Sequence, residues 1–238
     1  MNYLRSDGST SRISRLAAQG AIAAAAAALL LLAALHVLSA EFNPAWRMVS
    51  EYANGRYSWV LSAMFAAWGV SSWALVLALR AEARSTPVRV GLVFLAIAGV
   101  GEAMAAVFDI NHDMMHGVAG ALGILGLPVA AMLISVGLGR TERWSAARRT
   151  LLWTANLTWI SVVLLAATFV MLVVTFSQVP GGPPAQAPNV LPHGVIGLVG
   201  WANRLIVVSY CAWVVGAAWH TLRMSPATAR FGRPAIST

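Results

Sequence analysis

Lysine is absent from this 238-residue sequence, so all sixteen basic residues are arginines. Cysteine is nearly absent as well, and the single Cys211 excludes an intramolecular disulfide. Charged residues of both signs make up only 10% of the chain, whereas hydrophobic residues make up 59%. A soluble domain needs far more polar surface than this composition supplies, so we expect the chain to lie in a membrane.

The motifs of several enzyme classes are also missing. The sequence has no phosphate-binding P-loop, no GxSxG nucleophile elbow, no CxxC pair and no CxxCH haem-attachment motif. It therefore gives no direct indication of a reaction.

Long apolar stretches take up most of the chain, which has a mean hydropathy of +0.72. A helix needs roughly 20 apolar residues to cross the hydrocarbon core of a bilayer. Six stretches reach that length: about 16–40, 57–79, 88–108, 116–138, 150–176 and 194–222. Because alternating barrel strands are absent, we expect an all-α, polytopic membrane protein built as a six-helix bundle. Residues 1–15 and 223–238 then flank a transmembrane domain at 16–222.

The arginines gather on one side of the predicted spans. Thirteen lie on the side that carries both termini: Arg5, Arg12, Arg15, Arg80, Arg84, Arg89, Arg140, Arg143, Arg148, Arg149, Arg223, Arg230 and Arg233. The opposite side has only Arg47 and Arg56, and Arg204 lies within the sixth stretch. Because positive charge collects in cytoplasmic loops, we expect the N-terminal segment and the C-terminal tail to be cytoplasmic. The net charge of +8 therefore indicates topology, and no nucleic-acid partner is expected.

Two outer loops have distinct compositions. The loop at 41–56 is expected to form a short interfacial helix, with Arg47 and Glu51 paired at i,i+4 spacing and facing water. The loop at 177–192 contains five prolines and cannot be regular structure. We expect it to be a solvated connector in preference to a lid.

One short pattern occurs twice. Residues 116–123 and 193–200 both read HGVxGxxG, and each is expected to open a span at the outer surface. Glycines at this spacing make a smooth helix face that lets another helix or a flat ligand approach closely. Close helix packing is the preferred interpretation, because glycine is common in membrane helices.

Two ionisable residues fall inside the predicted spans. Such residues are costly in a membrane and mark a functional site by default. Glu102 lies about 10 Å below Asp109, and Arg204 lies about 16 Å below His193, at 1.5 Å per helical residue. We expect Glu102 and Arg204 to face the bundle interior and to pair, with Asn203 adding a hydrogen bond. A structural pin between spans three and six is the alternative.

Polar side chains also gather at the predicted outer surface. They are His36, Asp109, His112, Asp113, His116 and His193. Four of the five histidines in the chain therefore lie near one membrane face. Three chemical interpretations compete for this group.

The first interpretation is a divalent metal. His112 and His116 have the i,i+4 spacing that places two imidazoles on one helix face, and Asp109 or His193 completes a ligand set. An open coordination position would activate water for a metal-dependent lipid hydrolase. The geometry is doubtful where His112 falls in the turn before the helix.

The second interpretation is haem. His116 and His193 open two spans at matching depth, and their glycine-lined faces leave room for a porphyrin. Because two histidines are its whole support, we disfavour this interpretation.

The third interpretation needs no cofactor and is preferred. Glu102 and Arg204, beneath Asp109, His116 and His193, would bind a lipid head group or small polar ligand, or relay protons. The pocket would open to the extracytoplasmic side, and membrane lipids would be the main partners.

A third functional class is an accessory subunit of a larger membrane complex or a homo-oligomer. In that role the buried polar groups would only lock helices together.

The chain also resembles a known family. The resemblance rests on HVLSAEFNPAWRMVSEYANGRYSW at 36–59, on Glu102 in span three, on Asp109 with His116-Gly117, and on GWANR at 200–204. In these features the chain is similar to the bacterial six-helix membrane proteins of domain-of-unknown-function family 998, over about 16–222. The resemblance implies a six-span fold in the inner membrane and brings no activity.

The predicted topology is testable with reporter fusions in the full chain. Alkaline phosphatase fused after Gly55 or after Pro184 should be active, because these loops are expected outside, and a fusion after Arg149 should be inactive. The reverse pattern of activity would show that the orientation is wrong.

Overall fold

A computed structural model describes residues 3–180, 188 and 190–224, with side chains from Arg12 onward. The described chain is helical, with six long helices: α1 Tyr3–Leu38, α2 Ser58–Leu79, α3 Thr86–Val107, α4 Asp113–Gly139, α5 Arg148–Ser177 and α6 Val199–Met224. Each is long and apolar enough to cross a membrane, counting Arg12–Leu38 of α1. The predicted six-helix membrane fold is confirmed.

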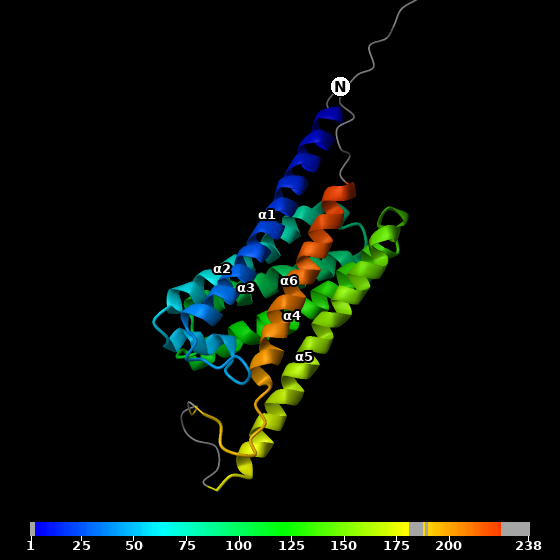
Figure 1. Ribbon diagram of the computed structural model, residues 1–238. Helices are drawn as coiled ribbons and strands as arrows, with labels where there is room; N and C mark the ends of the chain where they lie inside the picture. The colour runs from blue at the N-terminus through cyan, green and yellow to red at the C-terminus, as the bar shows by residue number, and fades with distance from the viewer. Residues whose placement is uncertain (1–2, 181–187, 189, 225–238) are drawn as a thin grey trace, which may run out of the picture.

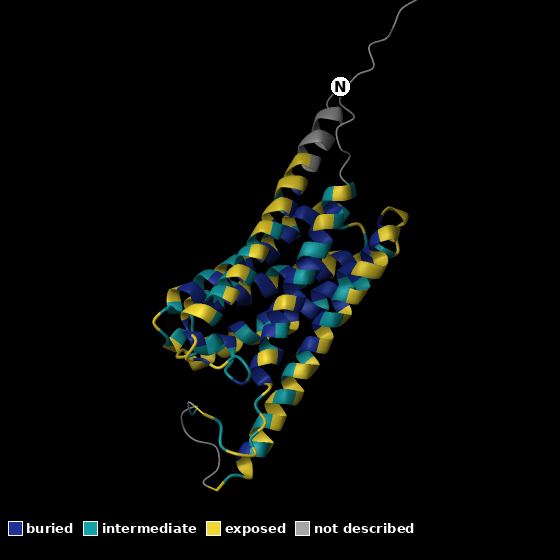
Figure 2. Cartoon of the chain, in the orientation of Figure 1, coloured by how far each residue is buried: buried dark blue, intermediate teal, exposed yellow. Residues whose placement is uncertain are grey.

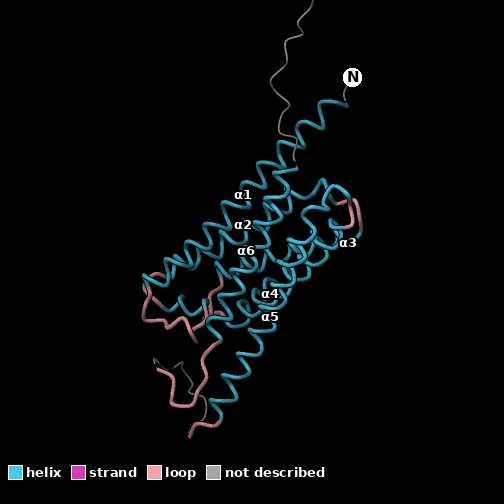
Figure 3. The backbone as a smooth tube through the Cα atoms, turned by 45° about the vertical axis from the view of Figure 1, so that its right-hand side comes forward, coloured by secondary structure: helices cyan, strands magenta, loops and turns pink. Residues whose placement is uncertain are grey.

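Each helix packs against the next in the chain, and α6 packs back against α1 (Figure 1). The helices therefore form a closed ring in which neighbours run in opposite directions. Loops are confined to the two ends of the bundle (Figure 3). The start of α1 and the end of α6 lie at one end (Figure 1). Residues 39–57 and the turn at 108–112 lie at the other, which we call the first-loop end.

Small residues let α3 and α4 approach closely. A Cβ added to Gly101 of α3 would lie 2.5 Å from the backbone nitrogen of Gly123 in α4. One added to Gly91 would lie 2.7 Å from the Ile134 side chain. Without a hydrophobic drive between helices in lipid, such close contacts are a main source of helix association. The buried faces line the bundle interior, and the exposed faces look outward (Figure 2).

The sixth helix starts later than predicted. The sequence analysis placed its start near residue 194, but α6 begins at Val199, after an irregular segment in which Gly194 has a φ of +88°. Only glycine adopts that φ readily, so the chain turns here before entering the helix. The repeated HGVxGxxG pattern is thus helical at 116–123 and mostly non-helical at 193–200.

The loop between α1 and α2, residues 39–57, which we call the first loop, packs inward more than predicted. Only Val49–Asn54 is helical, as the 3₁₀ helix η1. The predicted pair of Arg47 and Glu51 is confirmed at 2.6 Å, but both side chains are largely buried and do not face water. Tyr52 is fully buried. The proline-rich loop was predicted to be a connector, and its residues 181–187 and 189 lie outside the described part of the chain.

Pro128 interrupts the hydrogen bonding of α4 without ending the helix. Because proline has no backbone N–H, the carbonyl of Ile124, four residues earlier, loses its helical donor. The Tyr210 hydroxyl of α6 donates to this carbonyl at 2.5 Å. A bond between helices thus replaces the missing bond within α4.

The replacement bond makes a testable prediction. Tyr210→Phe should destabilise the protein by about 1–2 kcal/mol, because it leaves the Ile124 carbonyl unpaired. In a Pro128→Ala background the same substitution should cost less, since the new N–H of residue 128 can donate to Ile124. Thermal unfolding of the four purified variants measures this coupling. An equal cost in both backgrounds would contradict the account.

Candidate functional site

The Arg204 side chain, near the start of α6, is only 4% exposed, and each of its guanidinium nitrogens donates a hydrogen bond. Its Nε donates to His36 Nε2 at 2.7 Å, and its Nη2 donates to the Tyr52 hydroxyl at 2.8 Å. Its Nη1 donates to the carbonyls of Arg47 and Gly200 at 2.7 and 3.0 Å. The guanidinium therefore ties α6 to α1 and to the first loop.

His36 has a defined role in this cluster. Its Nδ1 lies 2.7 Å from the Leu32 carbonyl, one turn earlier in α1. Because Nδ1 donates to that carbonyl and Nε2 accepts from Arg204, the ring is the neutral Nδ1–H tautomer. The sequence analysis placed His36 with the histidines of the outer surface, but its side chain instead belongs to the Arg204 cluster.

Asn203 and Gly200 fix the first loop against α6. The Asn203 side-chain oxygen accepts from the Val49 backbone N–H at 2.8 Å, which holds the start of η1. The Gly200 N–H donates to the Ala45 carbonyl at 2.9 Å. A Cβ at Gly200 would collide with the Pro44 carbonyl oxygen, so only glycine permits this approach.

Glu102 is buried as predicted, with 3% exposure, but it does not pair with Arg204. Its Oε2 accepts from the Ser72 hydroxyl of α2 at 2.7 Å. Its Oε1 is buried and has no hydrogen-bond partner among the described residues. The predicted ion pair is wrong because Glu102 faces α2, whereas Arg204 faces α1 and the first loop.

Glu102 lines a cavity of about 420 Å³ at the first-loop end of the bundle. The walls come from α2, α3, α4, α5, α6 and η1, and most are apolar: Phe65, Trp68, Ala105, Ile124, Leu165, Ile206 and Val207. His116 and Asn203 also line it. This volume and composition are typical of a small-molecule site with few polar groups.

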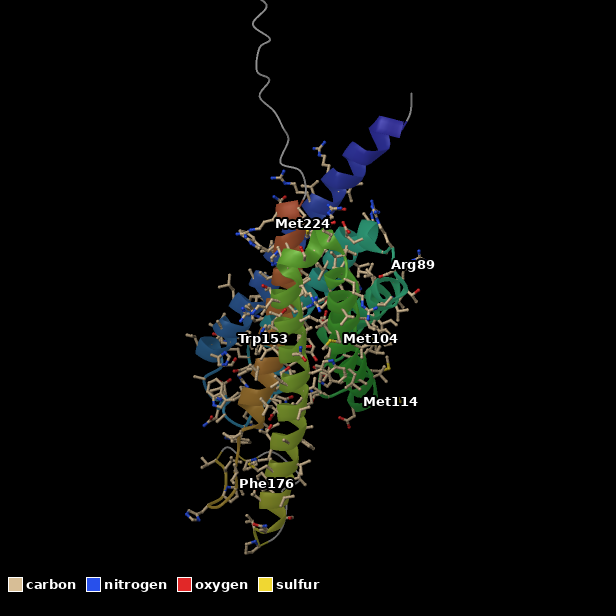
Figure 4. The ribbon with its side chains drawn as sticks, turned by 90° about the vertical axis from the view of Figure 1, so that its right-hand side faces the viewer. Arg89, Met104, Met114, Trp153, Phe176 and Met224 are labelled. Atoms are coloured by element: carbon tan, nitrogen blue, oxygen red, sulfur yellow. The ribbon has the colours of Figure 1, made fainter. Side chains whose placement is uncertain are left out.

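The cavity opens along one face of α4. Gly117, Ala121 and Leu125 all line the cavity and are exposed. Their i,i+4 spacing places them on one side of the helix over about 12 Å. Since α4 is a membrane-crossing helix, this opening faces the side of the bundle and not only its end. In Figure 4, α5 runs beside α3 and α4, and Phe176 near the end of α5 lies lower in the view than Met114 at the start of α4.

The remaining predicted site residues lie around the turn between α3 and α4 and before α6. Asp109 Oδ1 accepts from His112 Nδ1 at 3.0 Å and from the Asn111 backbone N–H. Slight burial opposes ionisation, but the hydrogen bonds from His112 and Asn111 outweigh it and lower the pKa of Asp109. Both side chains of this pair are exposed, and the pair lies in the turn before α4.

Of the four predicted metal ligands, the structure brings only Asp109 and His112 into contact. His116 Nδ1 lies 2.9 Å from the Phe108 carbonyl, and His193 is exposed in the segment before α6. Among the described residues, no group of three or more His, Cys, Asp or Glu side chains is arranged to hold a metal ion. His112 lies in the turn, so its i,i+4 spacing with His116 does not make a helical pair. The haem interpretation also assumed that both histidines open a span, whereas His193 precedes α6, which begins at Val199.

Comparison with known proteins gives a family and no activity. A family described as "Protein of unknown function (DUF998)" matches residues 22–220. The chain belongs to this family. No curated protein and no solved structure matches the chain.

Three residues of the site were missed in the sequence analysis: Ser72, Trp68 and Tyr52. Ser72 and Trp68 are one helical turn apart on α2, and both are buried. The only sequence signal for these two residues was their i,i+4 spacing, which places a hydroxyl and an indole N–H on one face of an apolar span. Tyr52 was missed because nothing in the loop sequence indicates its contact with Arg204.

The Arg204 cluster makes a prediction about stability. Arg204→Met should lower the free energy of unfolding by roughly 3 kcal/mol or more, because it leaves several buried acceptors unpaired. Arg204→Lys should recover less than half of that loss, since an ammonium cannot reproduce the planar fork of donors. Thermal unfolding in detergent measures both, with exposed Arg56→Met as the control. A lysine variant as stable as the unaltered protein would contradict this role.

Proposed function

We propose that this DUF998 protein binds an amphipathic, lipid-like molecule in the cavity beside α4, with Glu102 as the main polar recognition group. The observation that carries the proposal is the Glu102 Oε1 atom: Glu102 lines the cavity, and this buried atom has no hydrogen-bond partner among the described residues. An unsatisfied buried acceptor costs about 1–3 kcal/mol, and more for a charged group. A bound ligand that donates to Oε1 removes that cost.

The cavity walls determine the rest of the ligand. Apart from Glu102, His116, Asn203 and Ser50, the lining is apolar or aromatic, so most of the ligand is apolar too. The opening along Gly117, Ala121 and Leu125 lets such a molecule enter from the bilayer. A ligand that is delivered by the membrane has no need of a water-filled path.

The arginine distribution supports a location for the site. With both termini cytoplasmic in a bacterial inner membrane, the first-loop end is extracytoplasmic. The cavity then lies in the outer half of the membrane, and membrane lipids are the natural pool of ligands. His116 and Asn203 would meet the ligand, whereas Asp109 and His193 lie beyond the cavity lining. Arg204 supports the wall from behind.

The experiment uses the full chain in dioleoyl phosphatidylcholine nanodiscs. The probes are three diazirine-bearing dodecyl compounds that end in a hydroxyl, a methyl ketone or a trimethylammonium group. After illumination, mass spectrometry compares labelling of residues 117–125, on the cavity side of α4, with residues 169–174 of α5, which are largely exposed and do not line the cavity. At least one probe should favour the α4 segment.

Two substitutions test the role of the site. Glu102→Ala should lower α4 labelling by the favoured probe about ten-fold, because the loss of a hydrogen bond to a buried polar group costs about 1–3 kcal/mol. Gly120→Phe should abolish it by filling the cavity, and its Cβ meets only Ile124 Cδ1, at 4.0 Å. Exposed Glu41→Ala is the matched control and should change nothing. If no probe favours α4 in the folded protein, the cavity does not bind such molecules, and a purely structural role is favoured.

A further inference from the structure

A second buried polar group without a partner lines the same cavity. Trp68 of α2 is 5% exposed, and its indole Nε1 has no hydrogen-bond partner among the described residues. Buried indole N–H groups are normally paired. In this protein Nε1 of the buried Trp144 donates to Glu82 Oε2, and Nε1 of the buried Trp213 donates to the Ser135 hydroxyl. Trp68 is therefore an exception within its own chain.

Trp68 and Glu102 belong to one polar wall. Trp68 precedes Ser72 by one turn of α2, and the Ser72 hydroxyl holds Glu102 Oε2 at 2.7 Å. The Trp68 ring is fixed by stacking on Phe65, with ring centroids 6.3 Å apart, and by an edge contact with Tyr210. Among the described residues, this wall of the cavity therefore holds two buried polar atoms without a hydrogen-bond partner, the donor Trp68 Nε1 and the acceptor Glu102 Oε1.

We propose that the ligand is a neutral long-chain alcohol: its hydroxyl oxygen accepts from Trp68 Nε1 while its proton is donated to Glu102 Oε1. This inference rests on the proposed function and names the chemical class of its ligand. A hydroxyl is the simplest group that both donates and accepts a hydrogen bond. It satisfies both orphaned atoms at once.

Ligands with other polar end groups would leave Trp68 Nε1 or Glu102 Oε1 without a hydrogen-bond partner. A ketone, ester or ether accepts from Trp68 but has nothing to donate to Glu102. A protonated amine donates but cannot accept, and a quaternary ammonium does neither. An ionised carboxylate cannot donate and places a second acceptor beside Glu102. Each of these leaves a buried group unpaired, which is the usual source of strong discrimination between similar ligands.

The apolar chain of the alcohol has a path out of the cavity. Gly117 would place a Cβ in open space, and a Cβ at Gly120 would touch only Ile124. The missing side chains leave a smooth strip on α4 that leads from the polar wall to the exposed face. A hydrocarbon chain that lies along this strip reaches the surrounding lipid while its hydroxyl stays inside.

The test is competition against the hydroxyl-ended photoprobe in the same nanodiscs. Unlabelled dodecanol should compete at least about ten-fold better than the methyl ketone of equal chain length, or than dodecane, as expected for one added hydrogen bond. Dodecyltrimethylammonium should compete no better than dodecane. Labelling is again read on residues 117–125.

Two conservative variants then change the preference in different ways. In Glu102→Gln, Ser72 retains the amide oxygen and the NH₂ group faces the cavity, so the alcohol-over-ketone preference should fall to within about two-fold. Trp68→Phe removes the donor and should weaken alcohol and ketone alike, about ten-fold each. Exposed Trp59→Phe is the control and should leave both unchanged. Thermal unfolding confirms that each variant is folded.

The outcomes separate this inference from the proposed function. Preferential α4 labelling with equal competition by alcohol, ketone and alkane would overturn the alcohol assignment and leave the cavity as a binding site. The same holds if the preference is unchanged in Glu102→Gln. If no probe labels the α4 segment, the cavity holds only water, and both proposals are overturned.

Discussion

The hydrogen-bonded Arg204 guanidinium is the interaction on which the first-loop end of the structure depends. An arginine carries five N–H donors in a fixed plane and does not lose its charge, so burying it requires acceptors in fixed places. Here His36, Tyr52 and two backbone carbonyls supply them. These acceptors come from α1, the first loop and α6 itself. Satisfying one side chain therefore fixes three separate segments, and the fixed first loop supplies Met48, Val49 and Ser50 to the cavity wall.

Glu102 and Arg204 are both buried, yet they have opposite hydrogen-bonding states. Arg204 makes four hydrogen bonds within the protein, whereas one buried oxygen of Glu102, at the cavity wall, has no partner in the part of the chain that the structure describes. A buried charge that is fully bonded stabilises an arrangement, while an orphaned polar atom in an apolar cavity indicates a missing partner. This contrast assigns a structural role to the arginine and a ligand-facing role to the glutamate. Polar residues within spans need not share one function.

The sequence predicts the number, length and burial of the helices well, because apolar length and charge placement are local properties. It also identifies Glu102 and Arg204 as interior residues, since few exposed positions in lipid tolerate them. It fails on their partners, because depth along two helices says nothing about the direction in which each side chain points. The orientation of Arg204 depends on the first loop, whose packing rests on the absence of a side chain at Gly200 and on a positive φ at Gly194. These features belong to the tertiary structure, and the periodicity of the sequence does not predict them.

The two copies of the HGVxGxxG pattern also differ in a way that depends on tertiary packing and bears on binding. Before and at the start of α6, Gly197 and Gly200 are covered by Trp46 and by the backbone of the first loop, so the missing side chains are used for packing. In α4, Gly117 and Gly120 are not covered, and the missing side chains leave open space beside the cavity. The same pattern is thus packed against another segment at 193–200 and left uncovered beside the cavity at 116–123. The Tyr210 hydroxyl of α6 is bonded to the Ile124 carbonyl of α4, and Ile124 together with the uncovered glycines lines the cavity.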